Sequence, residues 1–268
     1  MAETLQIPGP DVAWLAPRLP SESVIQSAKS QSRPFVTLTF ATSLDSSLSL
    51  APGVRTRLSG SESKAMTHHL RRHHAAILVG VGTVLADDPG LNCRIDGANI
   101  DAQPRPIVLD PRGRWDVTEH SKVLEVARAN NGLAPFVLVG PSAVNPERKA
   151  ILEAHGGKFV ILEPRKTEPR FDWPSILSAL HAEGLESVMI EGGGQVINSL
   201  LDPAYQRLVD RVIVTIAPTW LGRGGVVVSP DRVQDTEGMP VPAARLTDVA
   251  WHQFGEDIVL SGQPSLDA

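Results

Sequence analysis

The feature that most constrains the fold is a repeated alternation, between residues 35 and 193, of short apolar runs and longer amphipathic segments. Short apolar runs bounded by glycine, proline or polar clusters predict buried strands, whereas longer segments with helical periodicity predict helices. Chains that alternate these two elements are typical of α/β domains. The predicted strands are FVTLTFA, AAILVG, PIVLD, PFVLVG, KFVILE and SVMIEGG, and the predicted helices cover 61–74, 145–156 and 173–184.

The two ends of the chain differ from this pattern. After Asp202 the runs DRVIVTIAPTW, GGVVVS and VAWHQFGEDIVLSG predict antiparallel strands that complete the sheet. Residues 1–33 mix proline, serine and short apolar runs, which predicts an irregular extension that docks through Trp14 and Leu15. Since neither a repeat nor a Gly/Ser-rich linker interrupts the rest, we expect one domain over residues 34–268.

Composition excludes several classes of function. A formal net charge of -5 and a pI near 5.9 argue against a surface for nucleic acid. The single cysteine, Cys93, allows neither an internal disulfide nor a cysteine-rich zinc cluster, which favours the reducing cytoplasm. No run approaches the roughly 18 apolar residues of a membrane span. We therefore expect a cytoplasmic protein without a nucleic-acid or membrane partner.

The first candidate binding loop is ILVGVGTVLADDP, residues 77–89. Gly80 and Gly82 let the backbone come close to an anion, and Thr83 carries a hydroxyl that can donate. The loop is not a dinucleotide fingerprint, because Leu85 occupies the position of the third glycine. A plain strand-to-helix turn without a ligand explains this segment equally well.

The second candidate loop is VMIEGGGQVINSLL, residues 188–201. Three successive glycines between a strand and a helix can expose several backbone N–H groups to a pyrophosphate. Glu191 precedes them at the end of an apolar strand, where an unpaired carboxylate would be costly. Glu191 is therefore either catalytic or hydrogen-bonded to backbone groups of the sheet, and the sequence leaves both readings open.

Other polar residues carry weaker signals. Asp45 lies in ATSLDSSLS, which by itself predicts a turn. His69 and His73 are four residues apart on a predicted helix, but no third ligand accompanies them, so a solvated helix face is favoured and no metal is expected. Arg71 and Arg94 supply the planar fork that suits a phosphate.

Four strings identify a resemblance when they are taken in order. PFVTLTFATSLD, HHLRRHHAAILVGVGTVLADDPGLNCR, VMIEGGGQVINSLL and APTWLGRGG resemble the reductase domain of riboflavin biosynthesis, from about Pro34 to the end of the chain. The resemblance implies a dihydrofolate reductase-like fold, which is a single α/β domain with a central mixed, mostly parallel sheet flanked by helices. It also implies a homodimer, NADPH as cofactor and a small phosphorylated pyrimidine as substrate.

The resemblance also implies roles for individual residues. In the implied reaction a hydride passes from the nicotinamide to C1′ of the ribose, in its ring-opened imine form. Glu191 would contact the substrate and assist ring opening or proton delivery, and Asp45 is the other candidate for that task. The implied substrate contacts are Arg71, Leu91 and Arg94, and the implied NADPH contacts are Thr83, Asp87, Ile161, Gly192, Gly193, Gly194, Gln195 and Val196.

Departures from the family pattern narrow the expectation. Bacterial two-domain members read LDG where this chain has Ser46 after Asp45, and they often carry a lysine where this chain has Thr39. The zinc deaminase signature of those members is absent, so the chain resembles the stand-alone reductase of fungi and archaea. The implied substrate is then 2,5-diamino-6-ribosylamino-4(3H)-pyrimidinone 5′-phosphate. The alternatives are a same-fold reductase of the deaminated pyrimidine or of a pteridine, and a nucleotide-binding protein without turnover.

Overall fold

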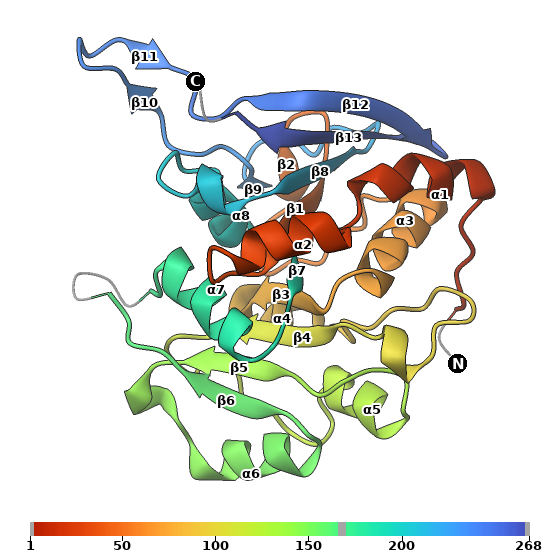
Figure 1. The fold of residues 1–268 in the computed structure, drawn as a ribbon, viewed down its shortest axis with the longest axis vertical. Helices are drawn as coiled ribbons and strands as arrows, with labels where there is room; N and C mark the ends of the chain where they lie inside the picture. The colour runs from red at the N-terminus through yellow and green to blue at the C-terminus, as the bar shows by residue number, and fades with distance from the viewer. Residues whose placement is uncertain (1–2, 166–169, 266–268) are drawn as a thin grey trace.

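A nine-stranded sheet organises the part of the chain that the computed structural model describes, residues 3–165 and 170–265. Its strand order is β12-β13-β8-β1-β7-β3-β4-β5-β6, from the C-terminal hairpin at the top of Figure 1 to β6 at the bottom. The strands are β1 Phe35–Thr42, β3 Ala76–Gly80, β4 Arg105–Leu109, β5 Phe136–Val139, β6 Lys158–Ile161, β7 Ser187–Ile190, β8 Arg211–Ile216, β12 Leu246–Phe254 and β13 Asp257–Pro264.

The sheet is parallel from β8 to β6 and antiparallel at the β12–β13 edge. The expected α/β fold with a mixed, mostly parallel sheet is therefore confirmed. One expectation for the chain after Asp202 is wrong: β8 runs parallel to β1 and not antiparallel, with Thr37 opposite Arg211. The reason is that α8 carries the chain back across the sheet before β8 begins, as in other strand–helix–strand units.

Helices cover both faces of the sheet, because successive strand side chains point to opposite sides. Leu78 packs with α7 and α8, whereas its neighbours Ile77 and Val79 pack with α4, α5 and α6 on the other face. The helices are α1 Gly9–Leu15, α2 Glu22–Lys29, α3 Ser61–Arg72, α4 Val81–Asp87, α5 Lys122–Arg128, α6 Pro146–Ala154, α7 Trp173–Ala182 and α8 Gly194–Leu200.

Two short ribbons lie outside the main sheet. β2 (Ser47–Ser49) pairs with β9 (Val226–Val227), so the expectation that the run GGVVVS completes the main sheet is wrong: it pairs antiparallel with β2 in a small separate sheet. β10 (Val233–Gln234) and β11 (Pro240–Val241) form a hairpin that projects from the body in Figure 1. The β2–β9 ribbon joins the turn after β1 to the segment around Val226, which lies far away in the sequence.

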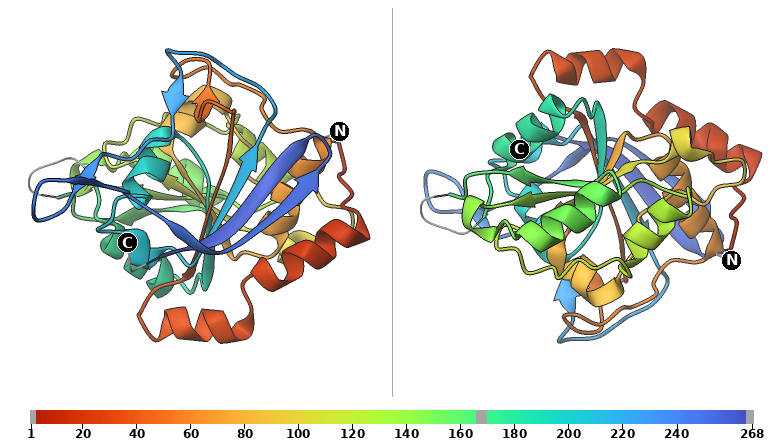
Figure 2. Two further views of the ribbon diagram at one scale, coloured as in Figure 1. Left: turned by 90° about the horizontal axis from the view of Figure 1, so that it is seen from above. Right: turned by 90° about the horizontal axis from the view of Figure 1, so that it is seen from below.

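The N-terminal segment is helical and not irregular as expected. Figure 2 shows α1 and α2 at the periphery of the molecule. Leu15, at the end of α1, is fully buried with Met66 and Leu70 of α3, and Trp14 packs against the same cluster. The docking of Trp14 and Leu15 is therefore confirmed.

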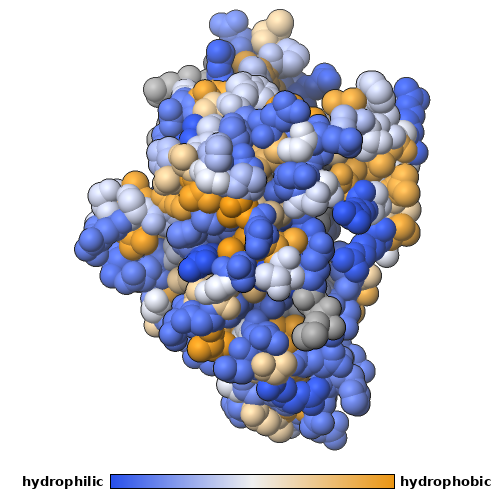
Figure 3. All heavy atoms as spheres, turned by 90° about the vertical axis from the view of Figure 1, so that its right-hand side faces the viewer, coloured by the Kyte–Doolittle hydropathy of each residue, from blue (hydrophilic) through white to orange (hydrophobic). Residues whose placement is uncertain are grey.

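The outer surface is mostly polar. On the face shown in Figure 3, hydrophilic residues predominate and apolar residues form small patches between them. In the described part of the chain, none of the helices has the length and apolar character needed to cross a membrane.

Candidate active site

Two glycine-bearing loops meet at the carboxyl edge of the sheet, where β3 and β7 end side by side. Ile190 lies opposite Leu78, and the pairing continues with a hydrogen bond from Glu191 N to Leu78 O (2.9 Å). The chain enters α4 at Gly80 and α8 at Gly193, and neither helix receives a side-chain N-cap. Backbone N–H groups of both loops are therefore left for other acceptors at this edge.

Two positions of the second loop require glycine, Gly192 because of its backbone conformation and Gly194 because β9 lies close to it. Gly192 has φ +132°, and a Cβ atom there would lie 3.5 Å from both Gly80 N and Thr83 Oγ1. At Gly194 a Cβ atom would come within 2.7 Å of Val226 Cγ1 in β9. These constraints leave bare backbone where the two loops approach each other.

Glu191 forms a two-pronged ion pair with Arg71 of α3. Arg71 Nη2 donates to Oε2 (2.8 Å) and Nε donates to Oε1 (3.2 Å), and both side chains are less than one-fifth exposed. The carboxylate is thus hydrogen-bonded, although not to backbone groups of the sheet. Arg71 Nη1 also donates to Asn92 O (3.1 Å), so the same guanidinium holds the segment after α4.

The segment that carries Leu91 and Arg94 lies beside this pair. Leu91 is buried with φ +52°, a left-handed conformation that is unusual for a large side chain. Arg94 lies against His68 of α3, through its backbone N (3.1 Å to Nδ1) and its Nη2 (3.1 Å to Nε2). Burial and the positive charge of Arg71 lower the pKa of Arg94. The structure therefore brings the predicted substrate residues together around α3.

Asp45 occupies a tight loop after β1. Its carboxylate accepts hydrogen bonds from Ser43 Oγ, Leu221 N (3.1 Å) and Gly222 N (2.8 Å). The Ser43 hydroxyl and the Leu221 amide hold the pKa of Asp45 below its usual value. Asp45 thus joins the turn after β1 to the APTWLGRGG segment, close to the β2–β9 ribbon.

The residues predicted to contact the cofactor lie along the same edge of the sheet. Thr83 faces the Gly192 loop, and Asp87 ends α4 with a buried Oδ1 atom that has no hydrogen-bond partner within the described chain. Gln195 and Val196 follow the triple glycine in the first turn of α8. Ile161 is 55% exposed at the end of edge strand β6, separated from β3 by β4 and β5.

The expectation of a solvated helix face is wrong for His69, which is 7% exposed, and is confirmed for His73, which is exposed at the end of α3. His68, His69 and the following His74 are all at least 90% buried. Burial is the first cause of their low pKa values, about 2 for His68 and about 4 for His69 and His74. These rings are neutral at physiological pH. Residues 3–165 and 170–265 contain no group of three potential metal ligands.

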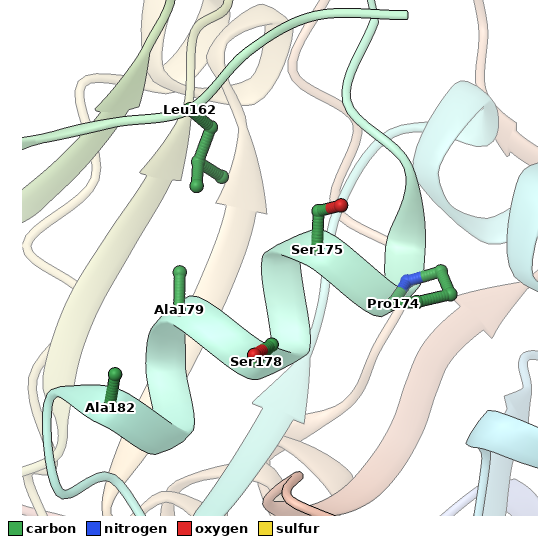
Figure 4. Close-up of a pocket in the computed structure, with 6 residues that line it drawn as sticks. All are labelled: Leu162, Pro174, Ser175, Ser178, Ala179 and Ala182. Carbon is green, nitrogen blue, oxygen red and sulfur yellow. The ribbon is translucent and has the colours of Figure 1, made fainter.

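Two hollows lie away from these residues. The first lies between Leu162 and the small side chains Ser175, Ser178 and Ala179 of α7 (Figure 4). The second lies between α8 and the β10–β11 hairpin. Neither is lined by the residues named above. The candidate site is the edge of the sheet where the two glycine loops, α3 and the 91–94 segment meet.

Sequence reasoning missed three contributors to this site. His68 and Gln103 hold the 91–94 segment, since Gln103 accepts from Cys93 N (2.8 Å) and donates to Cys93 O (3.1 Å). Val226 closes over Gly194. A signal existed for His68 alone, because it lies three residues before Arg71 and so on the same face of the helix.

Comparisons with a family model and with curated proteins point to the same family. The family model described as "RibD C-terminal domain" matches residues 34–260. Curated proteins named 2,5-diamino-6-ribosylamino-4(3H)-pyrimidinone 5′-phosphate reductase are similar over most of the chain. The one from Debaryomyces hansenii is 44% identical, covering 85% of this chain and 88% of its own. The one from Methanothermobacter thermautotrophicus is 35% identical, covering 85% of this chain and 97% of its own.

Solved structures of riboflavin biosynthesis proteins are similar to this chain as well. The riboflavin biosynthesis reductase Rib7 of Saccharomyces cerevisiae superposes with a TM-score of 0.74 at 34% identity, over 95% of this chain and 99% of that chain. RibD of Acinetobacter baumannii gives a TM-score of 0.68 at 28% identity, over 89% of this chain and 60% of that chain.

Proposed function

The chain belongs to the RibD C-terminal domain family, and we propose that it is the reductase that converts 2,5-diamino-6-ribosylamino-4(3H)-pyrimidinone 5′-phosphate to its ribitylamino product with NADPH. The relatives of similar length carry the name of this reductase. One observation of the site carries the proposal: the Arg71–Glu191 ion pair lies beside two glycine loops that meet at one edge of the sheet.

The residues at this edge fit a nicotinamide dinucleotide. The exposed backbone at Gly193, where a Cβ atom would meet only Thr83 Oγ1 at 3.7 Å, leaves room for a pyrophosphate, and the uncapped starts of α4 and α8 supply N–H donors. The buried Oδ1 atom of Asp87 lacks a donor, and a ribose hydroxyl would supply one. When bound, the cofactor supplies the hydride.

The proposed cofactor contacts spread along the edge. Thr83, Asp87 and the residues from Gly192 to Val196 would hold the central part. Ile161 lies three strands from β3, roughly 14 Å away at the usual strand spacing, and would contact a distal part of an extended dinucleotide.

The phosphorylated pyrimidine would contact the other side of the site. Arg71, Leu91 and Arg94 are the proposed substrate contacts, with the Arg94 guanidinium turned to the 5′-phosphate. Arg71 uses three of its five N–H groups on Glu191 and Asn92, which leaves two for a ligand. Glu191, paired with Arg71, would guide ring opening of the ribose or proton delivery beside C1′.

Asp45 has a different proposed role. Its hydrogen bonds to Leu221 and Gly222 and its lowered pKa favour a carboxylate that orders the loop over the site rather than one that delivers a proton. We therefore place the proton-handling role on Glu191.

The remaining proposals concern the whole chain. We propose that residues 34–268 form the reductase domain, with residues 1–33 as an extension packed on it, and that the protein acts as a cytoplasmic homodimer. Exposed apolar side chains on the edge hairpin, Val249, Trp251 and Ile258, support a surface for a second copy.

The test is NADPH oxidation, followed by nicotinamide absorbance, with the diamino and the deaminated ribosylamino-pyrimidine phosphates offered separately. We expect fast oxidation with the diamino compound and little with the other. Preference for the deaminated compound would make the chain a same-fold reductase with another substrate. Oxidation with neither compound would contradict a reductase of this pathway and favour a nucleotide-binding protein.

A further inference from the structure

The half-buried Arg94 has different contacts from Arg71. Its guanidinium has no carboxylate at ion-pair distance within residues 3–165 and 170–265, whereas the Arg71 guanidinium is paired with Glu191. The side chain at hydrogen-bond distance from Arg94 is His68, a ring that is 4% exposed and neutral, whereas Glu3 pairs with Lys64 and acts on Arg94 only from a longer distance.

The chemistry of the imidazole decides what this contact does. Nδ1 of His68 accepts the backbone N–H of Arg94 (3.1 Å), so the single ring proton of the neutral form lies on Nε2. Nε2 therefore cannot accept from Arg94 Nη2, although the two nitrogens are 3.1 Å apart. The ring therefore fixes Arg94 through its backbone N–H and forms no hydrogen bond with the guanidinium, because two N–H donors face each other there, so the guanidinium donors are not used up.

The backbone on either side of this contact is fixed as well. The buried Gln103 side chain bonds both N and O of Cys93, and Cys93 Sγ donates to His68 O (3.1 Å). Arg71 donates to Asn92 O. The Cys93 and Arg71 side chains thus hold residues 92–94 against α3, and Gln103 fixes the backbone of Cys93 from the other side.

From these contacts we propose that His68 is a positioning residue that sets Arg94 for the substrate phosphate while leaving its N–H donors unpaired. This inference rests on the proposed function, since it takes Arg94 as the phosphate contact. A carboxylate in place of His68 would hold Arg94 equally firmly, but it would compete with the phosphate for the same donors. A neutral ring avoids this competition.

The first test is steady-state kinetics of the full-length protein. In His68→Leu, which removes the Nδ1 acceptor, we expect the KM for the phosphorylated substrate to rise about tenfold or more, with the KM for NADPH unchanged within about twofold. His68→Asn restores an acceptor at the position of Nδ1 and should recover much of that loss. His69→Leu is the matched control, because His69 is buried next to His68 and does not contact Arg94.

A binding measurement distinguishes this inference from the proposed function, because it needs no turnover. Calorimetric titration with ribose 5-phosphate, and with ribose as the blank, should show weaker binding in His68→Leu and in Arg94→Ala, with no further loss in the double variant. Should His68→Leu fail to fold, His68→Ala makes the same comparison. Wild-type affinity in the folded His68 variant, additive losses in the double variant, or no ribose 5-phosphate binding by the wild type would each overturn the inference.

Discussion

At the scale of single residues, the site depends on the different partners of its two arginines, Arg71 and Arg94. Two N–H groups of Arg71 donate to the carboxylate of Glu191. The guanidinium N–H groups of Arg94 donate to no carboxylate in the described chain, because the side chain next to them is the neutral ring of His68. The ion pair also explains how a carboxylate is kept at the end of an apolar strand. A charge there is stabilised by a two-pronged arginine and needs no backbone donors from the sheet.

Replacement of Glu191 by Gln should lower kcat on the order of 100-fold or more, as for loss of a group that handles a proton, and should leave NADPH affinity unchanged. Turnover and NADPH titration measure the two effects. Glu186→Gln is the control, because Glu186 makes an exposed ion pair with Lys29. Unchanged kcat in Glu191→Gln would remove Glu191 from the reaction.

Replacement of Arg94 by Ala should raise the KM for the phosphorylated substrate about tenfold to a hundredfold, the usual worth of a charged hydrogen bond. The KM for NADPH should stay close to wild type. Arg72→Ala provides the comparison, since Arg72 is exposed at the end of α3. Equal effects on both KM values would place Arg94 outside the phosphate site.

At the scale of secondary-structure elements, α3 serves the core and the site together. Met66 and Leu70 pack into a buried cluster, while His68 and Arg71 face the 91–94 segment. The glycines at the start of α8 also differ in why they are needed. The backbone conformation at position 192 requires glycine, whereas Gly193 has φ -68°, which any residue can adopt. Different glycines in one motif should therefore respond differently to substitution.

Gly192→Ala should lower the melting temperature, because an L-residue is strained at φ +132°. Gly193→Ala should leave the melting temperature nearly unchanged, because its backbone is extended and its Cβ atom would meet only Thr83 Oγ1 at 3.7 Å. It should instead weaken NADPH binding, since the new methyl group would occupy the exposed cradle. Thermal melts and NADPH titrations of both variants check this contrast, and equal melting temperatures would contradict it.

The buried histidine that follows α3 predicts a pH dependence of stability. His74 accepts from Thr37 Oγ1 and donates to Leu70 O, and burial lowers its pKa from 6.5 to about 4. Between these two values the unfolded chain binds the additional proton, so the free energy of unfolding should fall as the pH falls through this window. One such histidine contributes roughly 1.4 kcal/mol per pH unit.

Urea unfolding between pH 7 and pH 5 measures this slope. His74→Gln should flatten the slope relative to wild type, because it removes one of the groups that bind a proton only on unfolding. His120→Gln, at an exposed position, should leave it unchanged. An unchanged slope in His74→Gln would show that His74 is not linked to unfolding.

At the scale of the whole molecule, the sequence predicts most elements of the central sheet and its helices, but neither the N-terminal helices α1 and α2 nor the long-range partners of the elements. The strands β1 and β3 to β7 and the helices α3, α6 and α7 could be predicted because their apolar periodicity is local. The parallel direction of β8 could not, because it depends on the path of the chain after α8. The burial of His68 was missed for a related reason: its partner, Arg94, lies 26 residues along the chain.

In the candidate site too, local features could be predicted from the sequence and long-range contacts could not. The two glycine loops could be located from the sequence, since glycine runs between a strand and a helix are local signals. That Glu191 pairs with Arg71, 120 residues away, and that Asp45 joins Leu221 and Gly222 became visible only in the folded chain.

The central claim is hydride transfer from NADPH to C1′ of the ribosylamino substrate. The most direct measurement uses NADPH deuterated at both C4 positions, with the diamino pyrimidine phosphate as substrate and mass and NMR spectra of the product. We expect one deuterium per product molecule, located at C1′ of a ribityl chain. Oxidised cofactor with an unlabelled product, or a label at any other carbon, would contradict it.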